Sequence, residues 1–322
     1  MKKALEKIKG FNTIFWVLLG YIILCMIFVP NFLNLYNLKN LLSQICVLLT
    51  VACGVHFTVL NGGVDFSATA IIAFAGVIGA SIMSETDGLL AGKWYAVPTA
   101  VGVMLLIGIA FGLINGFSII TFKMPSFIVT MAMQMIGVGL AVLYTKGRTI
   151  GFLPVSFTGL GTGYIGVIPY ATIFAAIVAF ITHTILSRTR LGREIYAIGT
   201  NPKTARISGI PVKKTILKIF VISSLCASCA SILMIAQMES AAASFAGTMF
   251  IDIMASIIIG GTSPFGGRGK IINTFMGVCI IILITVSMNL LGMKWFTISI
   301  IKGSIILIAV TIDLVRQSRV RA

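Results

Sequence analysis

Residues 189–214 read TRLGREIYAIGTNPKTARISGIPVKK, the one long polar interruption in a chain that is otherwise almost continuously apolar. Within this stretch Asn201 is a residue type that caps helices, and Pro202 suits a first helical position. Gly209 suits the residue just past a helix end. The pattern therefore predicts a helix of about two turns, from Pro202 to Ser208.

A helix this short is marginal alone in water, so it needs a surface to lie against. Two interpretations stay open, a solvated loop helix at a membrane surface or a docking element that another protein grips. The stretch is also strongly basic. Its basic residues, together with Arg188 just before it, are Arg188, Arg190, Arg193, Lys203, Arg206, Lys213 and Lys214.

The composition indicates an integral membrane protein. The chain is 58% hydrophobic and only 10% charged, whereas a soluble domain carries about 25% charged residues. The net charge of +16 would suggest nucleic acid in a soluble protein. Here the basic residues stand between apolar spans, which is typical of loops that face the cytoplasm and anionic membrane lipid. No interleaved aromatic and basic patches occur, so we expect no nucleic-acid partner.

The order of apolar segments predicts an all-α membrane protein, a polytopic bundle of about ten transmembrane helices in a single domain over residues 1–322. The basic start and the apolar run after it predict an uncleaved first span, because the run is too long for a signal peptide and no cleavage site follows. The eighth segment is short, so it is tilted or re-entrant. The segments cover about residues 11–29, 41–60, 66–83, 95–119, 127–144, 167–186, 215–238, 249–260, 271–291 and 296–315.

The distribution of basic residues predicts the orientation. An even number of spans puts both termini on one side, and most of the 24 basic residues fall in segments on that side. By the positive-inside rule, both termini and the polar stretch are cytoplasmic, and the glycine-rich loop 146–166 faces outward. The basic residues of the segments expected outside are Lys39, Lys93, Lys146, Arg148 and Lys294.

Two glycine-rich breaks, NGGVDFS at residues 61–67 and GGTSPFGGRGK at residues 260–270, interrupt the apolar pattern. Both would face the cytoplasm, so they suggest paired elements that flank a pathway. Polar residues in the spans either line this pathway or bond a neighbouring helix. The pathway or gate candidates are Asn61, Gly62, Gly63, Asp65, Ser67, Phe127, Thr130, Gln134 and Asn289, and those of the second break are Gly260, Gly261, Thr262, Ser263, Gly266 and Gly267.

Asp65 has two interpretations. A carboxylate at the start of a span can cap its free N–H groups, where the helix dipole favours negative charge. It can instead shape the cytoplasmic end of the pathway, in contact with a moving neighbour or a sugar hydroxyl. Substitution with Asn separates the two roles, because Asn is also a good cap.

No catalytic, metal-binding or nucleotide-binding constellation is present. The two histidines, His56 and His183, are isolated. The basic glycine-rich segment that ends at Lys270 is followed by Ile271, where a phosphate-binding loop needs a hydroxyl. Cys226 and the cysteine three residues later have the spacing of half a metal or redox motif, but no second pair completes it. We expect both to be packing residues, with no metal and no cofactor bound by this chain.

Short motifs in a fixed order along nearly the whole chain resemble the membrane-spanning permease subunits of bacterial ABC sugar importers, the ribose/xylose/autoinducer group. Thr69 and Thr149 stand where that family usually has Gly and Pro. The matching motifs are GGVDFS at 62–67, PSFIVT at 125–130, GRTI at 147–150, TRLGREIYAIGTN at 189–201, ARISGI at 205–210, IGGTS at 259–263 and GG at 266–267.

This resemblance implies a non-catalytic permease subunit that passes a small sugar, such as a ribose-like monosaccharide or related polyol, across the bacterial inner membrane. It also implies a second permease subunit in a homodimer or heterodimer, a cytoplasmic ABC ATPase that uses ATP and Mg, and an extracytoplasmic sugar-binding protein. The loop at 188–214 would then be the coupling loop. Its coupling helix would comprise Asn201, Pro202, Lys203, Thr204, Ala205, Arg206, Ile207, Ser208 and Gly209.

The alternatives are an ATP-independent secondary transporter or flippase, and a purely structural membrane scaffold. Ion-coupled carriers usually need ionisable residues at mid-membrane, and the expected spans hold few of them. The glycine breaks and the capped cytoplasmic helix argue against a scaffold. The ionisable candidates are Asp65, Asp252, Lys302 and Asp313.

Overall fold

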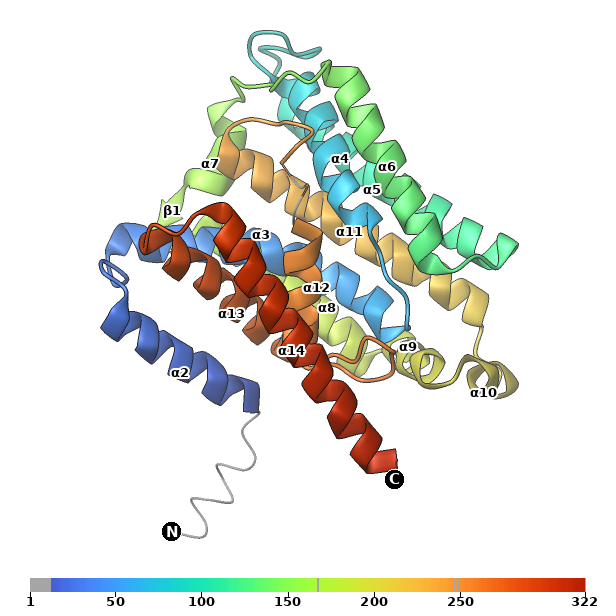
Figure 1. Cartoon of the computed structure of the whole chain (residues 1–322). Coiled ribbons are helices and arrows are strands. Elements are labelled where there is room, and N and C mark those ends of the chain that lie inside the picture. Colours follow the sequence, from blue (N-terminus) through green and yellow to red (C-terminus); the bar gives the residue numbers. More distant parts are fainter. Residues whose placement is uncertain (1–12, 167, 246, 248, 322) are drawn as a thin grey trace.

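The computed structural model describes residues 13–166, 168–245, 247 and 249–321, and most of them are helical (Figure 1). The basic start of the chain lies outside the described residues. The elements are α2 (Thr13–Phe28), α3 (Leu35–Leu60), α4 (Ser67–Met83), α5 (Ala96–Phe122), α6 (Ser126–Thr145), α7 (Val155–Thr162), β1 (Tyr164–Ile165), β2 (Ile168–Pro169), α8 (Tyr170–Arg188), α9 (Arg190–Thr200), α10 (Pro202–Ile207), α11 (Val212–Met238), α12 (Met249–Ile259), α13 (Ile271–Leu290) and α14 (Trp295–Arg321).

The helices support an all-α membrane protein, but the expected count of about ten spans is not confirmed. Among the described residues, six helices are long and apolar enough to cross a membrane, namely α3, α5, α6, α8, α11 and α13. Helices α2, α4 and α12 are shorter, at 16, 17 and 11 residues. A helix needs about 20 apolar residues to span a bilayer alone.

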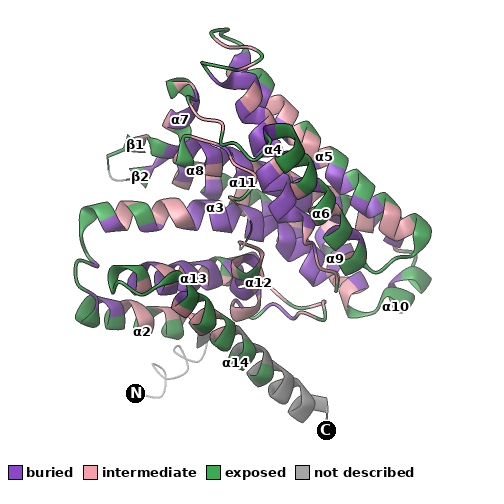
Figure 2. Ribbon diagram, turned by 45° about the horizontal axis from the view of Figure 1, so that its top comes forward, coloured by how far each residue is buried: buried purple, intermediate pink, exposed green. Residues whose placement is uncertain are grey.

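The interior is built around α3 and α11, which are mostly buried (Figure 2). Helix α11 packs against both α3 and α5. The approach to α5 is close because Gly108 and Gly112 face the α11 backbone, and a Cβ at Gly112 would lie 2.6 Å from the Cα of Val221. Small residues allow such contact where lipid supplies no hydrophobic drive between helices. Helices α5, α6 and α8 are apolar and less than a third buried, so they contribute outer faces of the bundle.

The two ends of the bundle carry different elements. Helix α7 and the β1–β2 hairpin lie at one end, and α9 and α10 lie at the opposite end (Figure 1). Near the first end, the backbone of Ile150 pairs with that of Ala241 in an antiparallel bridge. The bundle therefore holds the loop 146–154 against the connection between α11 and α12.

Several local expectations are corrected by the structure. The glycine-rich loop 146–166 contains a helix, α7, which begins after Pro154. The polar stretch forms α9 as well as the expected short helix, because Thr189 caps α9 by accepting from the Gly192 N–H at 3.3 Å. Helix α3 begins at Leu35 instead of 41, because Asn34 accepts a hydrogen bond from the Tyr36 N–H.

Candidate functional site

The predicted helix in the polar stretch is present as α10. The Asn201 Oδ1 atom accepts hydrogen bonds from the N–H groups of Lys203 (3.0 Å) and Thr204 (3.2 Å), and Pro202 occupies the first turn. Gly209 follows the helix with a φ of +77°, a conformation that glycine adopts at little cost. The capping pattern therefore gave the position of this helix correctly, with Ser208 as its C-cap.

Helix α10 has one face against its own chain and one face open. Ala205 is only 3% exposed and packs with Ile198 of α9 and Val212 of α11. Ile207 is 87% exposed, and Lys203 and Arg206 are exposed beside it. The helix thus leans on α9 and α11 and presents an apolar side chain, flanked by basic ones, away from the bundle.

Asp65 stands at the first glycine break, is fully buried and bonds to two helices, with a third linked through Ser67. Its Oδ1 atom accepts from the N–H (3.0 Å) and the hydroxyl (2.6 Å) of Ser67 at the start of α4. Its Oδ2 atom accepts from the hydroxyl of Ser223 on α11 at 2.7 Å. The Asn115 amide on α5 donates to the Ser67 hydroxyl at 2.8 Å. Asp65 stands one residue before Phe66, the N-cap of α4, and it accepts from the first N–H of the helix, while its bond to Ser223 links α4 to α11.

The first turn of α6 forms hydrogen bonds with the same glycine break. The Ser126 hydroxyl accepts from the Val64 N–H at 3.1 Å. The Thr130 hydroxyl has two acceptors within reach, the Val64 carbonyl at 3.1 Å and the Ser126 carbonyl of its own helix at 2.9 Å. One turn further on, the Gln134 amide donates to the Thr69 hydroxyl at 3.2 Å. The predicted candidate at 130 therefore lies against the break, and the one at 134 lies against the first turn of α4 that follows it. Ser126 was missed as a site residue, although its position directly after a proline at a helix start was a usable signal.

Two other candidates lie elsewhere. Phe127 is about half exposed on the outer side of α6. Asn289 is exposed in the last turn of α13 and makes no contact with the break that the structure records. The structure therefore places Thr130 against the first break and Gln134 against the start of α4, and it leaves the two other candidates away from the break.

The two glycine breaks touch each other. The Gly267 N–H donates to the Leu60 carbonyl at 2.8 Å, and a Cβ at Gly62 would lie 3.3 Å from the Phe265 carbonyl oxygen. In the second break, Gly260 and Gly261 end α12, and Thr262 reaches the His56 ring on α3. The Ser263 N–H donates to the Arg268 carbonyl at 2.9 Å, which closes the loop on itself. The two breaks are therefore in direct contact, and the pathway that they were expected to flank stays a prediction.

An aromatic pair adds to the contact between α4 and α12. The rings of Phe66 and Phe250 stack with centroids 4.0 Å apart. Phe66 directly follows Asp65, and Phe250 stands in the first turn of α12. The shortest apolar helix is thereby joined to the start of α4.

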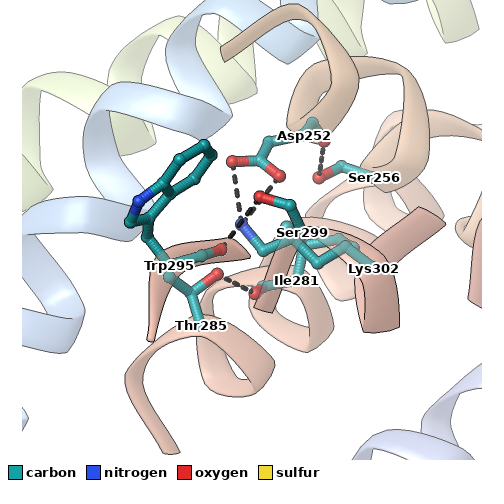
Figure 3. Close-up of polar contacts among 7 residues, drawn as sticks. All are labelled: Asp252, Ser256, Ile281, Thr285, Trp295, Ser299 and Lys302. Carbon is teal, nitrogen blue, oxygen red and sulfur yellow. Dashed lines mark hydrogen bonds and ion pairs between the residues drawn. The ribbon is translucent and has the colours of Figure 1, made fainter. Parts of the chain in front are cut away.

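Two of the ionisable residues expected in the spans form an ion pair (Figure 3). The Lys302 ammonium on α14 contacts both carboxylate oxygens of Asp252 on α12, at 2.9 and 3.1 Å. Figure 3 shows Ser256, Ser299 and Trp295 around the pair, with each serine hydroxyl bonded within its own helix. Pairing lowers the cost of two charges at membrane depth. The sequence identified both residues but could not pair them.

His56 and Cys226 are buried between helices of the bundle. The His56 Nδ1 atom lies 2.8 Å from the Thr274 hydroxyl of α13, within the bundle. Cys226 packs against the backbone of α3, where a Cβ at Gly54 would lie 2.5 Å from its own Cβ. Within the described part of the chain, no group of three or more His, Cys, Asp or Glu side chains could hold a metal ion.

Comparison with known proteins gives the family. Residues 37–310 match the family model described as "Branched-chain amino acid transport system / permease component". The chain is 36% identical to the ribose import permease RbsC of Bacillus subtilis, over 91% of this chain and 89% of that protein. It is 34% identical to the L-arabinose transport system permease AraH of Escherichia coli (97% and 92%) and 31% identical to the galactose/methyl galactoside import permease MglC of Haemophilus influenzae (98% and 99%).

No solved structure matches the chain significantly. The matches to sugar import permeases run over nearly the whole length of each relative, in agreement with the motifs spread along the sequence. They confirm the resemblance to the permease subunits of bacterial ABC sugar importers. The chain therefore belongs to the permease-component family of membrane transport proteins, as a relative of the ribose, arabinose and galactose import permeases.

Proposed function

We propose that this chain is the transmembrane subunit of an ATP-driven importer that passes a small sugar, a ribose-like monosaccharide or related polyol, across the inner membrane. The observation that carries the proposal is the 36% identity to a ribose import permease over 91% of the chain. The arabinose and galactose permeases support the wider class of monosaccharides. As a permease component, the subunit is not itself catalytic.

The proposed partners are a second permease subunit, identical or homologous, a cytoplasmic ABC ATPase that binds ATP and Mg, and an extracytoplasmic sugar-binding protein. Helix α10 supports the ATPase contact, because its exposed Ile207 and the basic residues beside it offer a mixed apolar and basic surface. The opposite end, with α7 and the hairpin, would receive the binding protein. Both termini would then be cytoplasmic, with about ten apolar helices embedded in the membrane.

The pathway is proposed to pass the first break, where Asp65, Ser67, Thr130 and Gln134 lie together. Hydroxyl, amide and carboxylate groups are those that bind sugar hydroxyls. The contact with the second break would let both loops respond when the ATPase moves α10.

A secondary transporter is the weaker alternative. Such carriers bind or move ions through ionisable groups at mid-membrane. In the described part of the chain, Asp252 is neutralised by Lys302, and Asp65 already accepts hydrogen bonds from two serines. The import permease relatives favour the ATP-driven class.

The test is to purify the detergent-solubilised chain with its co-expressed gene neighbours and to identify what binds it. The co-purified binding protein is then screened against monosaccharides and polyols. Reconstitution in liposomes measures uptake of the ligand with and without internal ATP. The proposal expects an ABC ATPase in the complex and uptake only with ATP. Uptake driven by an ion gradient without an ATPase would overturn it.

A further inference from the structure

The end of α9 meets both glycine breaks in one place. Gly199 is in the last turn of α9, and a Cβ at this position would collide with the Leu60 carbonyl oxygen and would lie 2.6 Å from the Gly267 nitrogen. The same Leu60 carbonyl accepts the hydrogen bond from the Gly267 N–H. Three backbone segments are thus in direct contact, and only glycine fits at position 199.

Gly266 of the second break is also in close contact with the first break and with α9. A Cβ at Gly266 would lie 2.8 Å from the Gly62 nitrogen and 2.9 Å from the Gly199 carbonyl oxygen. Gly266 and Gly62 both have positive φ angles, +89° and +76°. The backbones of α9 and of both breaks are therefore in close contact, so a displacement of the end of α9 would press on both breaks.

Tyr196 adds a side-chain bond one turn before Gly199. Its hydroxyl donates to the Gly269 carbonyl, in the second break, at 2.7 Å. Burial raises the pKa of Tyr196 above its usual value, so the phenol stays protonated and remains a donor at neutral pH. The bond anchors α9 to the far end of the second break.

Helix α10 is joined to α9 by Asn201 alone, and Ala205 packs on Ile198. The two short helices therefore form one packed unit. We infer that Tyr196 and Gly199 are positioning residues that transfer a displacement of α10 to both glycine breaks at once. The inference rests on the proposed function, because it assigns the route by which the ATPase would open the pathway.

The experiment compares sugar uptake and ATP hydrolysis in the same liposomes for the complete complex. Tyr196→Phe keeps the ring and removes the donor. We expect the amount of sugar imported per ATP hydrolysed to fall about threefold to tenfold, the range that one net hydrogen bond can shift an equilibrium, with the ATPase rate unchanged. The matched control is Tyr144→Phe, which removes a hydrogen bond to Ser81 at the other end of the bundle and leaves the ratio at the wild-type value.

A second variant, Gly199→Ala, places a methyl group against the Leu60 carbonyl and is expected to lower the ratio further. A wild-type ratio for Tyr196→Phe would overturn the inference. An equal fall in uptake and ATPase rate would also overturn it, because the contact would then serve only assembly. Absence of ATP-dependent uptake by the wild-type complex would instead overturn the proposed function.

Discussion

Asp65 accepts from the start of α4 and also bonds to α11, and substitution with Asn separates the hydrogen bonding from the negative charge. Asp65→Asn keeps an oxygen that can accept from Ser67, and the Ser223 hydroxyl can turn to accept from the new amide. We therefore expect normal amounts of folded protein and poor sugar uptake, because the charge between α4 and α11 is lost. Thermal unfolding in detergent and uptake at equal expression measure the two effects.

The matched variant Asp65→Leu removes all acceptors at this position. It leaves buried donors of Ser67 and Ser223 without a partner, at a cost of about 1–3 kcal/mol for each group. Its folded amount should fall as well as its uptake. Wild-type uptake by Asp65→Asn would reduce Asp65 to a helix cap.

At the residue scale, the sequence predicted local bonds and missed distant ones. The cap at Asp65 follows from the type of residue at a span start. Its partner Ser223 is 158 positions away, so the bond depends on how α11 is turned and shifted against α4. Periodicity does not encode that register in helices that are apolar all round. The sequence could not predict the pairing of Asp252 with Lys302 either, because that pairing depends on the register between α12 and α14.

Helix α10 offers a test of docking through Ile207. Ile207→Glu places a charge on the exposed side, where it should block an apolar contact with the ATPase without disturbing the bundle. We expect normal insertion, loss of the ATPase from the purified complex and loss of uptake. Ala205→Glu is a poor probe, because Ala205 is buried against Ile198.

The control for this docking test is Ile165→Glu, on the exposed hairpin at the opposite end. It should leave the ATPase bound. If Ile207→Glu co-purifies with a full complement of ATPase and transports normally, α10 is only a surface helix.

The ion pair between α12 and α14 should stabilise the fold mainly by keeping both charges paired. Lys302→Met leaves Asp252 without its partner, and this should lower the free energy of unfolding by about 3 kcal/mol. We expect a lower unfolding temperature in detergent. The double variant Asp252→Leu with Lys302→Met removes both charges and should recover most of the loss. A double variant less stable than Lys302→Met would contradict this account.

At the element scale, capping residues were better guides than composition. They placed α10 within one residue, because Asn201, Pro202 and Gly209 act locally. Helices α7 and α9 were missed because their sequences are polar or rich in glycine. Helix α9 is held by its amphipathic packing, with Ile195 and Ile198 buried, which the capping pattern did not reveal.

The orientation of the whole molecule can be tested by thiol labelling. Thr158, in the middle of the loop expected outside, is buried on α7, whereas Val155 is 82% exposed. Val155→Cys should react with a membrane-impermeant reagent in intact cells, because the positive-inside rule puts this end outside. Ile207→Cys should react only after permeabilisation. The reverse pattern would invert the topology.

At the scale of the whole molecule, the sequence predicted the class and the order of apolar segments. It did not settle the number of spans, because the apolar helices α2, α4 and α12 have 16, 17 and 11 residues, fewer than the roughly 20 that span a bilayer alone. Their depth in the membrane depends on what packs around them. The contact of α9 with both glycine breaks also depends on how the helices pack, because it joins segments that are far apart in the sequence.

The brevity of α12 has a consequence for biosynthesis. Its 11 residues extend about 16 Å, roughly half of a 30 Å hydrocarbon layer. The backbone leading into it cannot face lipid unprotected, and a Cβ at Gly277 of α13 would lie 2.9 Å from the Gly260 nitrogen. Helix α12 should therefore enter the membrane only together with α13. A chain truncated after residue 262 and released into membranes should leave α12 open to added protease, and one truncated after residue 292 and released in the same way should protect it; equal protection of both chains would show that α12 inserts by itself.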